Sequence, residues 1–416
     1  MAVIVGAASQ TPQPADPAAP STLDAALPAP APNVADGPLV ALVLPLSGRQ
    51  EALGMAVRDG FIARLLEAPD HRRFNLLLID EARVSAAEAH RQALDAGARA
   101  LVGPLLKESV QAMAPQAGVL TGAMPGQMPV LALNNLADGD PGAGTLWQFG
   151  LAPEDEARQV AARASALNQR RALVLVPASE WGQRLANAFA AEFTDRGGQV
   201  VETRSFAPGD TDYSATLRGL LLTTDPQPST ANPGETVASG PGRRTDADLI
   251  FVAANSSNGR QIMPQLRFFG AAGLPTYSTS AIWDDGETQA DDLNGVVFPD
   301  APWVIEPDAR ALAVKNGLLR HWGRNALGTS RLYALGYDAG ALLPAVLQQP
   351  VPGALPDLAG ATGTLFTDSA GRIHRRLPFA EVRGGRLVPL PDAGPPLSGA
   401  PVVPTPPTTT TTRNAP

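Results

Sequence analysis

The residues with the greatest chemical reactivity are few and widely spaced along this 416-residue chain. The four histidines, His71, His90, His321 and His374, do not have the spacing of a metal-ligand set. Cysteine is absent, which excludes disulfides, thiolate metal sites and cysteine nucleophiles. The sequence therefore predicts no metal site and no cofactor.

Motifs of the common enzyme classes are also missing. There is no G-x-S-x-G turn, and neither lysine lies in a phosphate-binding P-loop. Gly142-Ala143-Gly144 begins a dinucleotide fingerprint, but Trp147 stands where the third glycine belongs. Asp80-Glu81 and Asp284-Asp285 are paired carboxylates that could act in acid–base catalysis, although adjacent acids on loops are more often solvated. We therefore predict no catalytic residue and no enzyme.

Charge and hydrophobicity narrow the classes of partner. The chain has 32 basic and 40 acidic residues, a formal net charge of −8, and no basic stripe, so nucleic acids and anionic membrane surfaces are not expected partners. No apolar run approaches the roughly 20 residues of a transmembrane helix. Ala2–Ala8 resembles the tail of a secretory signal without its basic region, and a disordered leader explains it equally well.

The fold is predicted from alternating strand and helix patterns. Residues 39–44 form a near-continuous apolar run, which is typical of a strand buried on both faces of a parallel sheet. A helical pattern follows, and strand–helix units repeat up to about residue 148. A second series begins with the helix that opens at Pro153. We expect an α/β protein with two doubly wound parallel-sheet lobes, a hinge and an interdomain cleft.

The domain boundaries follow from these patterns and from composition. The Pro/Ala-rich start predicts a disordered leader, the Pro/Gly/Ser/Thr insertion at 225–245 predicts an exposed loop, and the Pro/Thr-rich end predicts a disordered tail. The predicted organisation is a leader at 1–37, one lobe at 38–148 plus 300–360, a second lobe at 149–299 plus 361–390, and a tail at 391–416.

Small polar residues follow several strands, where open α/β sheets bind ligands. The candidate ligand-cleft residues are Ser47, Gly48, Gly103, Pro104, Asn134, Asn135, Trp181, Asn255, Ser256, Ser280 and Trp283. If the two sheets face each other, these residues would line one cleft that closes on a small polar ligand by hinge motion. Because strand-end loops are polar and small in any case, a purely structural role stays open for each residue.

Several stretches resemble a known family. VALVLPLSG from Val40, ALVGPL at 100–105, PVLALNN at 129–135 and PEDEA at 153–157 resemble the type I periplasmic-binding fold of leucine-binding-like proteins. More distinctive are NGRQIMPQLRFFGAAGLPTYSTSAIWDD at 258–285 and DLNGVVFPDAPW at 292–303. These two are similar to the C-terminal domain of the LppC-type outer-membrane lipoprotein activators of penicillin-binding proteins. The resemblance covers roughly residues 38–390.

The resemblance implies a periplasmic, non-enzymatic protein that activates a bifunctional penicillin-binding protein, the enzyme that synthesises peptidoglycan. It also implies three chain crossings between the lobes, near residues 150, 299 and 360. Ser47, Gly103, Asn134, Trp181, Asn255 and Ser280 match the family's cleft positions.

Two family features are not found in the sequence, the N-terminal helical-repeat domain and the lipid-bearing cysteine. Outer-membrane anchoring is expected if the true N-terminus carries that cysteine. The alternative function is a solute-binding protein that delivers an amino acid or another small polar ligand to an ABC transporter. Glu180 and Asp284 are its only evident partners for a ligand ammonium group.

Overall fold

The computed structural model describes residues 37–67, 74–118, 127–136, 144–221, 244–286, 290–322, 328–368 and 370–393. The predicted leader, most of the 225–245 insertion and the tail beyond 393 lie outside the described residues. In the described part of the chain, no helix is both long and apolar enough to span a bilayer.

The first lobe is built on an eight-stranded sheet. Its strands are β1 (Leu39–Leu44), β2 (Asn75–Asp80), β3 (Ala100–Val102), β4 (Val130–Ala132), β5 (Leu146–Phe149), β11 (Leu358–Ala359), β12 (Thr364–Thr367) and β13 (Arg372–Arg376). Its helices are α1 (Glu51–Leu66), α2 (Ala86–Asp95), α3 (Lys107–Met113) and α10 (Ser330–Gln348). The strand order is β11-β12-β13-β5-β4-β3-β1-β2, and β1 to β5 run parallel.

The second lobe is built on a seven-stranded sheet. Its strands are β6 (Arg171–Pro177), β7 (Gln199–Phe206), β8 (Leu249–Val252), β9 (Thr276–Tyr277), β10 (Val296–Pro299), β14 (Phe379–Arg383) and β15 (Arg386–Leu390). Its helices are α4 (Pro153–Ala166), α5 (Glu180–Asp195), α6 (Ser214–Leu221) and α7 (Ser256–Phe268). The strand order is β15-β14-β10-β9-β8-β6-β7, and β6 to β10 run parallel.

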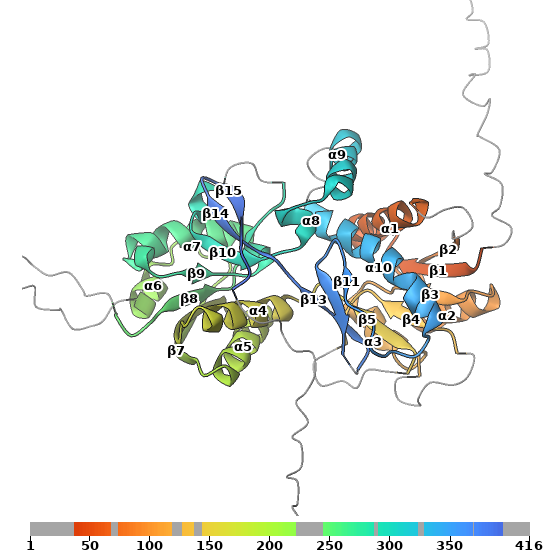
Figure 1. Ribbon diagram of the computed structural model, residues 1–416, viewed down its shortest axis with the longest axis horizontal. Helices are drawn as coiled ribbons and strands as arrows, with labels where there is room; N and C mark the ends of the chain where they lie inside the picture. Colours follow the sequence, from red (N-terminus) through yellow and green to blue (C-terminus); the bar gives the residue numbers. More distant parts are fainter. Residues whose placement is uncertain are drawn as a thin grey trace, which may run out of the picture.

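The remaining elements are short or lie between the lobes. They are α8 (Pro302–Ile305), α9 (Ala309–Trp322) and the 3-10 turns η2 (Gly48–Gln50), η4 (Ala271–Gly273), η5 (Ser280–Ile282) and η6 (Asp291–Leu293). Figure 1 shows the two lobes side by side, with α8 and α9 above their junction. The predicted fold class, two largely parallel α/β sheets, is confirmed.

Each sheet is covered by helices on both faces, which explains why its central strands are apolar throughout. In the first lobe, α1 and α10 cover one face and α2 and α3 the other. In the second lobe, α4 and α5 cover one face and α6 and α7 the other. The core of the second lobe also includes Ala56 of α1 and Tyr333 and Ala334 of α10, so apolar packing continues from one lobe into the next.

Helices α1 and α10 approach each other closely because glycine occupies both sides of their contact. A Cβ atom built on Gly60 would lie 2.0 Å from the carbonyl oxygen of Tyr333, and one built on Gly336 would lie 2.0 Å from that of Val57. Only hydrogen in place of a side chain lets the two backbones meet at these points. The same two helices carry Phe61 and Leu335, which fill the core below.

The third chain crossing lies elsewhere than the sequence predicted. The chain first passes between lobes from β5 to α4 and again from β10 to α8. The expected return near residue 360 is wrong, because β13 pairs in parallel with β5 of the first sheet. Residues 361–376 therefore belong to the first lobe, and the return falls at Leu377-Pro378. Pro378 lacks the N–H that a continuous strand would need, so β13 and β14 are two strands in different sheets.

We expect Gly336→Ala to destabilise the protein by more than about 2 kcal/mol, since the added methyl group would force α1 and α10 apart. Gly317→Ala is the matched control on α9, where the nearest atom to a new Cβ is 3.9 Å away. That control should be neutral or gain up to about 1 kcal/mol from helix propensity. Chemical denaturation measures both, and a Gly336→Ala protein as stable as the wild type would contradict the close-contact explanation.

Candidate functional site

The predicted residues of the first lobe lie together at the carboxyl edge of its sheet. Their side chains mainly form hydrogen bonds with neighbouring strand-end loops. The Ser47 hydroxyl donates to Asp80 Oδ2 at 2.6 Å, and the Leu46 amide donates to Asp80 Oδ1 at 2.9 Å. The side-chain amide of Asn134 donates to the carbonyl of Leu105 at 3.1 Å. These polar groups hold the strand-end loops together, as expected if the residues have a purely structural role.

The four remaining first-lobe residues make no side-chain hydrogen bond among the described residues. Gly48 is exposed, with open space around it, whereas Gly103 has φ +104 and lies against the carbonyl of Val43. Pro104 is buried beside it. Asn135 is half-buried, and its Oδ1 is a buried atom without a hydrogen bond among the described residues.

Glu81, which the sequence paired with Asp80 as a potential acid–base group and not as a cleft residue, is buried at the same edge. It accepts a hydrogen bond from the Leu105 amide at 3.1 Å. Burial raises its pKa to about 7, although contacts from Leu105, Ser109 and Leu106 lower it. Its neighbour Asp80 has a lowered pKa because hydrogen bonds from Ser47, Leu46 and Ala82 outweigh desolvation. Asp80 and Glu81 thus hold the strand-end loops by hydrogen bonds. They are not the two solvated acids that are more common on loops.

Most of the predicted residues of the second lobe stabilise the folded structure of that lobe. Asn255 caps α7 by accepting from the Asn258 amide at 2.8 Å, and Ser256 begins that helix. Trp181 lies on α5 and packs against the α4–α5 core. Trp283 is 7% exposed and stacks on Phe298 at a centroid distance of 6.3 Å. The tryptophan predicted as a cleft wall at 283 is therefore a core residue.

Ser280 is buried and binds the crossing helix α4. Its amide donates to Glu156 Oε2 at 2.8 Å, and its hydroxyl donates to Glu156 Oε1 at 3.0 Å. Both polar groups of Ser280 are therefore occupied by a carboxylate of the protein itself. Among the described residues, no hydrogen bond links a predicted first-lobe residue to a predicted second-lobe residue, so binding of a ligand between them stays a prediction.

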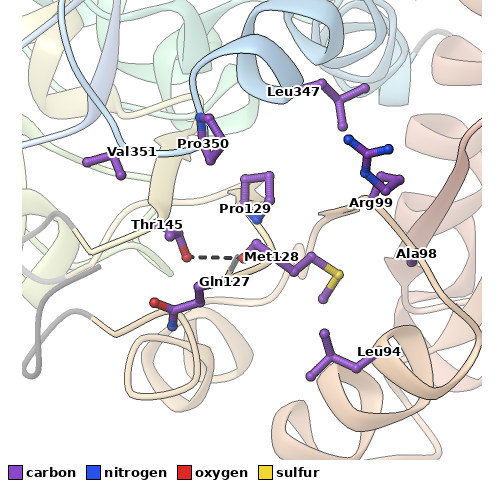
Figure 2. A pocket seen from close by; sticks show the side chains of 10 residues that line it. All are labelled: Leu94, Ala98, Arg99, Gln127, Met128, Pro129, Thr145, Leu347, Pro350 and Val351. Atoms are coloured by element: carbon purple, nitrogen blue, oxygen red, sulfur yellow. Dashed lines mark hydrogen bonds between the residues drawn. The ribbon is translucent and has the colours of Figure 1, made fainter. Parts of the chain in front are cut away.

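A hollow of about 370 Å³ opens at the opposite edge of the first sheet, away from all these residues (Figure 2). It lies where β3, β4 and β5 begin, and its lining is mainly apolar, with Leu94, Met128 and Leu347 among its members. The hydroxyl of Thr145 is 3.1 Å from two backbone carbonyls, those of Ala117 and Met128, to which it donates. This hollow therefore does not contribute to the predicted ligand cleft.

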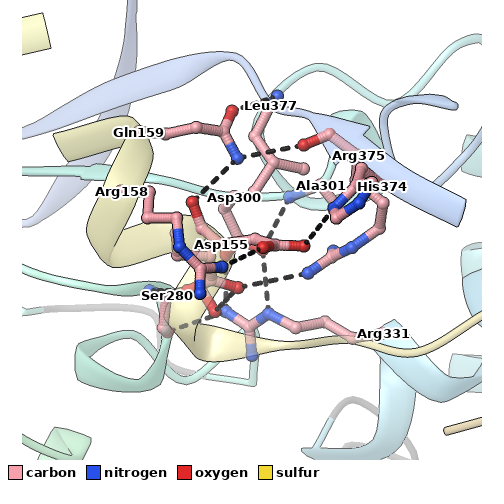
Figure 3. A network of polar contacts seen from close by, with 11 residues as sticks. Asp155, Arg158, Gln159, Ser280, Asp300, Ala301, Arg331, His374, Arg375 and Leu377 are labelled. Carbon is pink, nitrogen blue, oxygen red and sulfur yellow. Dashed lines mark hydrogen bonds and ion pairs between the residues drawn. The ribbon is translucent and has the colours of Figure 1, made fainter. Parts of the chain in front are cut away.

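The main polar feature of the molecule is a buried network where the lobes meet (Figure 3). Glu156 of α4 is 4% exposed and lies 3.5 Å from the guanidinium of Arg375, on β13. Burial raises the pKa of Glu156 to about 7, with Asp300 adding to the rise and with Arg375 and Ser280 opposing it. A charge removed from water to this extent requires partners close by, and they come from both lobes.

A second ion pair of the network is Arg331–Asp300. Arg331 on α10 donates to both carboxylate oxygens of Asp300, at 2.9 Å and 2.5 Å. Its guanidinium also donates to the carbonyls of Ser280 and Trp283, each at 3.2 Å. One arginine of the first lobe thus holds both the second crossing and the loop after β9.

Asp285, which the sequence paired with Asp284 as a potential acid–base group, is part of the same junction. It accepts from Lys315 of α9 and from the hydroxyl of Ser330, at 2.8 Å and 2.5 Å. The Lys315 amine also donates to the carbonyl of Trp303 at 3.0 Å. These contacts tie the second lobe to α9 and α10.

His374 extends the network on β13, between two carboxylates. Its Nδ1 lies 3.2 Å from Asp155 and its Nε2 lies 3.1 Å from Asp368. Burial lowers the pKa of His374, but the two carboxylates outweigh burial and raise it to about 9. The imidazolium therefore bridges α4 to β13 at neutral pH. In the described part of the chain, no cluster of acids and histidines could hold a metal ion.

Sequence reasoning missed this network, although one signal was present. Glu154, Asp155 and Glu156 lie in the first turn of α4, where acids also complement the helix macrodipole. Glu156 also lies four residues before Val160, within the stripe that buries Ala157 and Ala164. A carboxylate on the apolar stripe of a helix implies a buried partner, but the partner itself, Arg375, is far away in sequence.

We expect the free energy of unfolding to fall as pH rises from 6.5 to 9, because His374 keeps its proton in the folded state and loses it in the unfolded chain. The His374 contribution is complete below pH 6.5 and amounts to at most about 3 kcal/mol. His374→Gln should flatten this part of a urea-denaturation pH profile. His90→Gln is the control: burial lowers the pKa of His90, so above about pH 7.5 this residue is neutral in both the folded and the unfolded state. An unchanged slope in His374→Gln would refute the bridging role.

Sequence comparison finds curated relatives over most of the chain. The protein is 28% identical over 354 residues to the penicillin-binding protein activator LpoA of Vibrio vulnificus, and 27% identical over 361 residues to that of Photobacterium profundum. These alignments cover 82% and 84% of this chain, but 56% of each relative. The chain thus spans little more than half the length of the curated relatives it matches.

Structural comparison finds the same relatives and a wider fold group. The C-domain of LpoA from Haemophilus influenzae, described as a regulator of PBP1A, matches with a TM-score of 0.66 and 24% identity. The match covers 85% of this chain and 99% of that domain. The leucine-binding protein LivK of Thermotoga maritima matches with a TM-score of 0.53 and 20% identity over 85% of this chain and 98% of LivK. The fold is therefore of the type I periplasmic-binding kind.

The family itself is established by a match over most of the sequence. Residues 10–385 match the LppC family of lipoproteins, which confirms the resemblance drawn from the 258–303 motifs. The chain belongs to the LppC family.

Proposed function

We propose that this protein is a non-enzymatic activator of a bifunctional penicillin-binding protein and acts in the periplasm. The observation that carries the proposal is the match of both lobes to LpoA proteins, relatives that are named as activators or regulators of such enzymes. Since the chain spans 56% of the curated relatives, its partner and its activity are inferred for the shared two-lobe part.

The strand-end residues are hydrogen-bonded within the protein, which favours an activator that binds another protein over a receptor for a transported solute. A solute-binding protein needs polar groups that are free to receive its ligand. Here Ser47 is bonded to Asp80, Ser280 to Glu156, and Asn255 caps its own helix. Of the two predicted partners for a ligand ammonium group, Glu180 is paired at 3.6 Å with Arg184, and Asp284 accepts from the Gly286 amide.

The junction of the lobes supports the same conclusion. Hinge closure on a ligand requires the lobes to separate at low cost. In this chain, opening the junction would expose the apolar contact of Ala56 and Tyr333 with the second lobe and break the Arg331 and Lys315 ion pairs. Two lobes held in one orientation suit a protein whose outer surface is recognised.

Activation then requires contacts that favour one state of the synthase. A bound protein shifts a conformational equilibrium only when it binds the active state more tightly than the inactive state. A rigid two-lobe protein can make such contacts with little loss of conformational entropy on binding. The protein's own residues supply no chemical step in this function.

The family supports a periplasmic location. A lipoprotein family and a periplasmic enzyme partner together support the periplasm, with outer-membrane anchoring wherever a lipidated cysteine precedes the Pro/Ala-rich leader. Pull-down of the native protein from outer-membrane and soluble periplasmic fractions distinguishes an anchored from a free form.

Purified full-length protein should bind the host's bifunctional penicillin-binding protein saturably and increase its transpeptidase rate. The measurement is a binding isotherm by interferometry, paired with cross-linking of lipid II substrate at increasing activator concentration. Bovine serum albumin at equal mass is the control for crowding. Absence of binding at tens of micromolar would overturn the proposal.

A melting screen with amino acids and other small polar ligands tests the alternative. A transport receptor gains about 2.7 kcal/mol of stability at one hundred times its Kd, which raises the Tm by several degrees. We expect no such rise with any amino acid. A clear rise with one of them, in a protein that does not bind the synthase, would favour the solute-binding function.

A further inference from the structure

Helix α9 has an outer face that does not resemble a solvated surface. On a 3.6-residue helix, Ala309, Leu312, Ala313, Asn316, Leu319 and Arg320 share one side. All six are exposed, with Leu312 at 48% and Leu319 at 36%. A solvent-facing helix side is normally rich in charged residues, whereas this one has a single charge and two leucines one above the other. We call these six residues the α9 outer face.

The opposite side of α9 is already anchored, so the outer face is the side left over. Ala311 is buried and Val314 packs beside it in the core shared by the two lobes. Lys315, 12% exposed, is bonded to Asp285 and to the carbonyl of Trp303. Asp308 caps the helix start by accepting from the Ala311 amide at 2.7 Å. Figure 1 shows α9 standing out above the junction of the lobes.

The charges of α9 indicate what chemistry a partner must have. The helix carries Arg310, Lys315 and Arg320 and no acid, in a chain whose net charge is −8. Arg310 is paired at 3.5 Å with Glu67, and Lys315 is paired with Asp285. Within the described residues, Arg320 makes no ion pair or hydrogen bond. A complementary partner offers an apolar groove for the leucines and a carboxylate near Arg320.

We propose that the α9 outer face is the surface by which this protein docks into an apolar, acid-rimmed groove of the synthase. This rests on the proposed function and adds the location of the contact. A helix laid in a groove places anchors three, four or seven positions apart, which is the separation of Leu312 and Leu319. Since the helix is fixed at its base before binding, little order has to be gained on docking.

A lipid surface is the less favoured occupant. Interfacial helices combine large apolar residues with several free basic residues that attract anionic headgroups. Two of the three basic residues of α9 are committed to Glu67 and Asp285, which leaves Arg320 alone to attract anionic lipid. The acidic character of the whole chain adds repulsion from such a surface.

The test compares Leu312→Gln/Leu319→Gln with the wild type in binding to the bifunctional penicillin-binding protein. Each leucine contributes about tenfold when it is buried in a groove, so we expect the Kd to rise about 100-fold. Arg320→Glu should weaken binding on its own and make it less sensitive to salt. Leu94→Gln on α2, a leucine of equal 48% exposure, is the control and should bind normally. Thermal unfolding of all variants verifies that they are folded.

The outcomes separate this inference from the proposed function. Wild-type protein that binds the synthase, with the double variant binding equally well, would overturn the α9 inference alone. Wild-type protein that fails to bind would overturn both. If the double variant instead loses self-association in sedimentation, or loses binding to vesicles of phosphatidylglycerol and phosphatidylethanolamine, while keeping its affinity for the synthase, the face serves a second copy or a membrane and the inference is wrong.

Discussion

The buried charge at the junction of the lobes is the constraint on which the rest of the structure depends. Glu156 and Arg375 are nearly inaccessible to water, and each was brought there by a different segment of the chain. Glu156 accepts two hydrogen bonds from Ser280 and lies 3.5 Å from Arg375, whose Nε and Nη2 make no hydrogen bond among the described residues. Each of the two groups depends on the other for its ion pair, because burial removes them from water. The positions of α4, β13 and the loop after β9 are therefore fixed relative to one another, because moving any one of them would leave a charge unpaired.

This constraint also limits what the strand-end loops can do. In periplasmic-binding folds, the groups at the carboxyl ends of the strands are available to a ligand when the lobes are open. Here Ser280 satisfies the carboxylate of Glu156, and Trp283 supports the core under the second crossing. These polar groups are thus bonded to other groups of the same chain, which is consistent with the proposal that a partner is recognised at the outer surface.

Much of the fold could be predicted from sequence because its signals are local. The buried strand β1 and the proline that opens α4 each depend on neighbouring residues only. The parallel order of strands follows from alternating strands and helices. The distinctive 258–303 motifs added the family, which local pattern alone does not give.

The errors concern interactions between residues distant in sequence. The family resemblance implied a return crossing near 360, and nothing local in the sequence shows that β13 pairs with β5 instead. Trp283 looked like a cleft wall, since only its stacking on Phe298 makes it a core residue. Glu156 looked like a helix-end charge because its partner Arg375 lies more than two hundred residues later.

The position of β11 to β13 has a consequence for how the protein is made. These strands complete the first sheet, yet they are synthesised after nearly the whole second lobe, whereas β6 to β10 are contiguous in the chain. Contacts of long sequence separation form late, because the intervening chain must first be brought together. Residues 153–299 can therefore assemble while the first sheet still has an open edge at β5. The second sheet also waits for its last strands, because β14 and β15 follow β13 in the chain and pair at the edge of β10. Both sheets therefore keep an edge that needs protection from other unfinished chains until the C-terminal strands are in place.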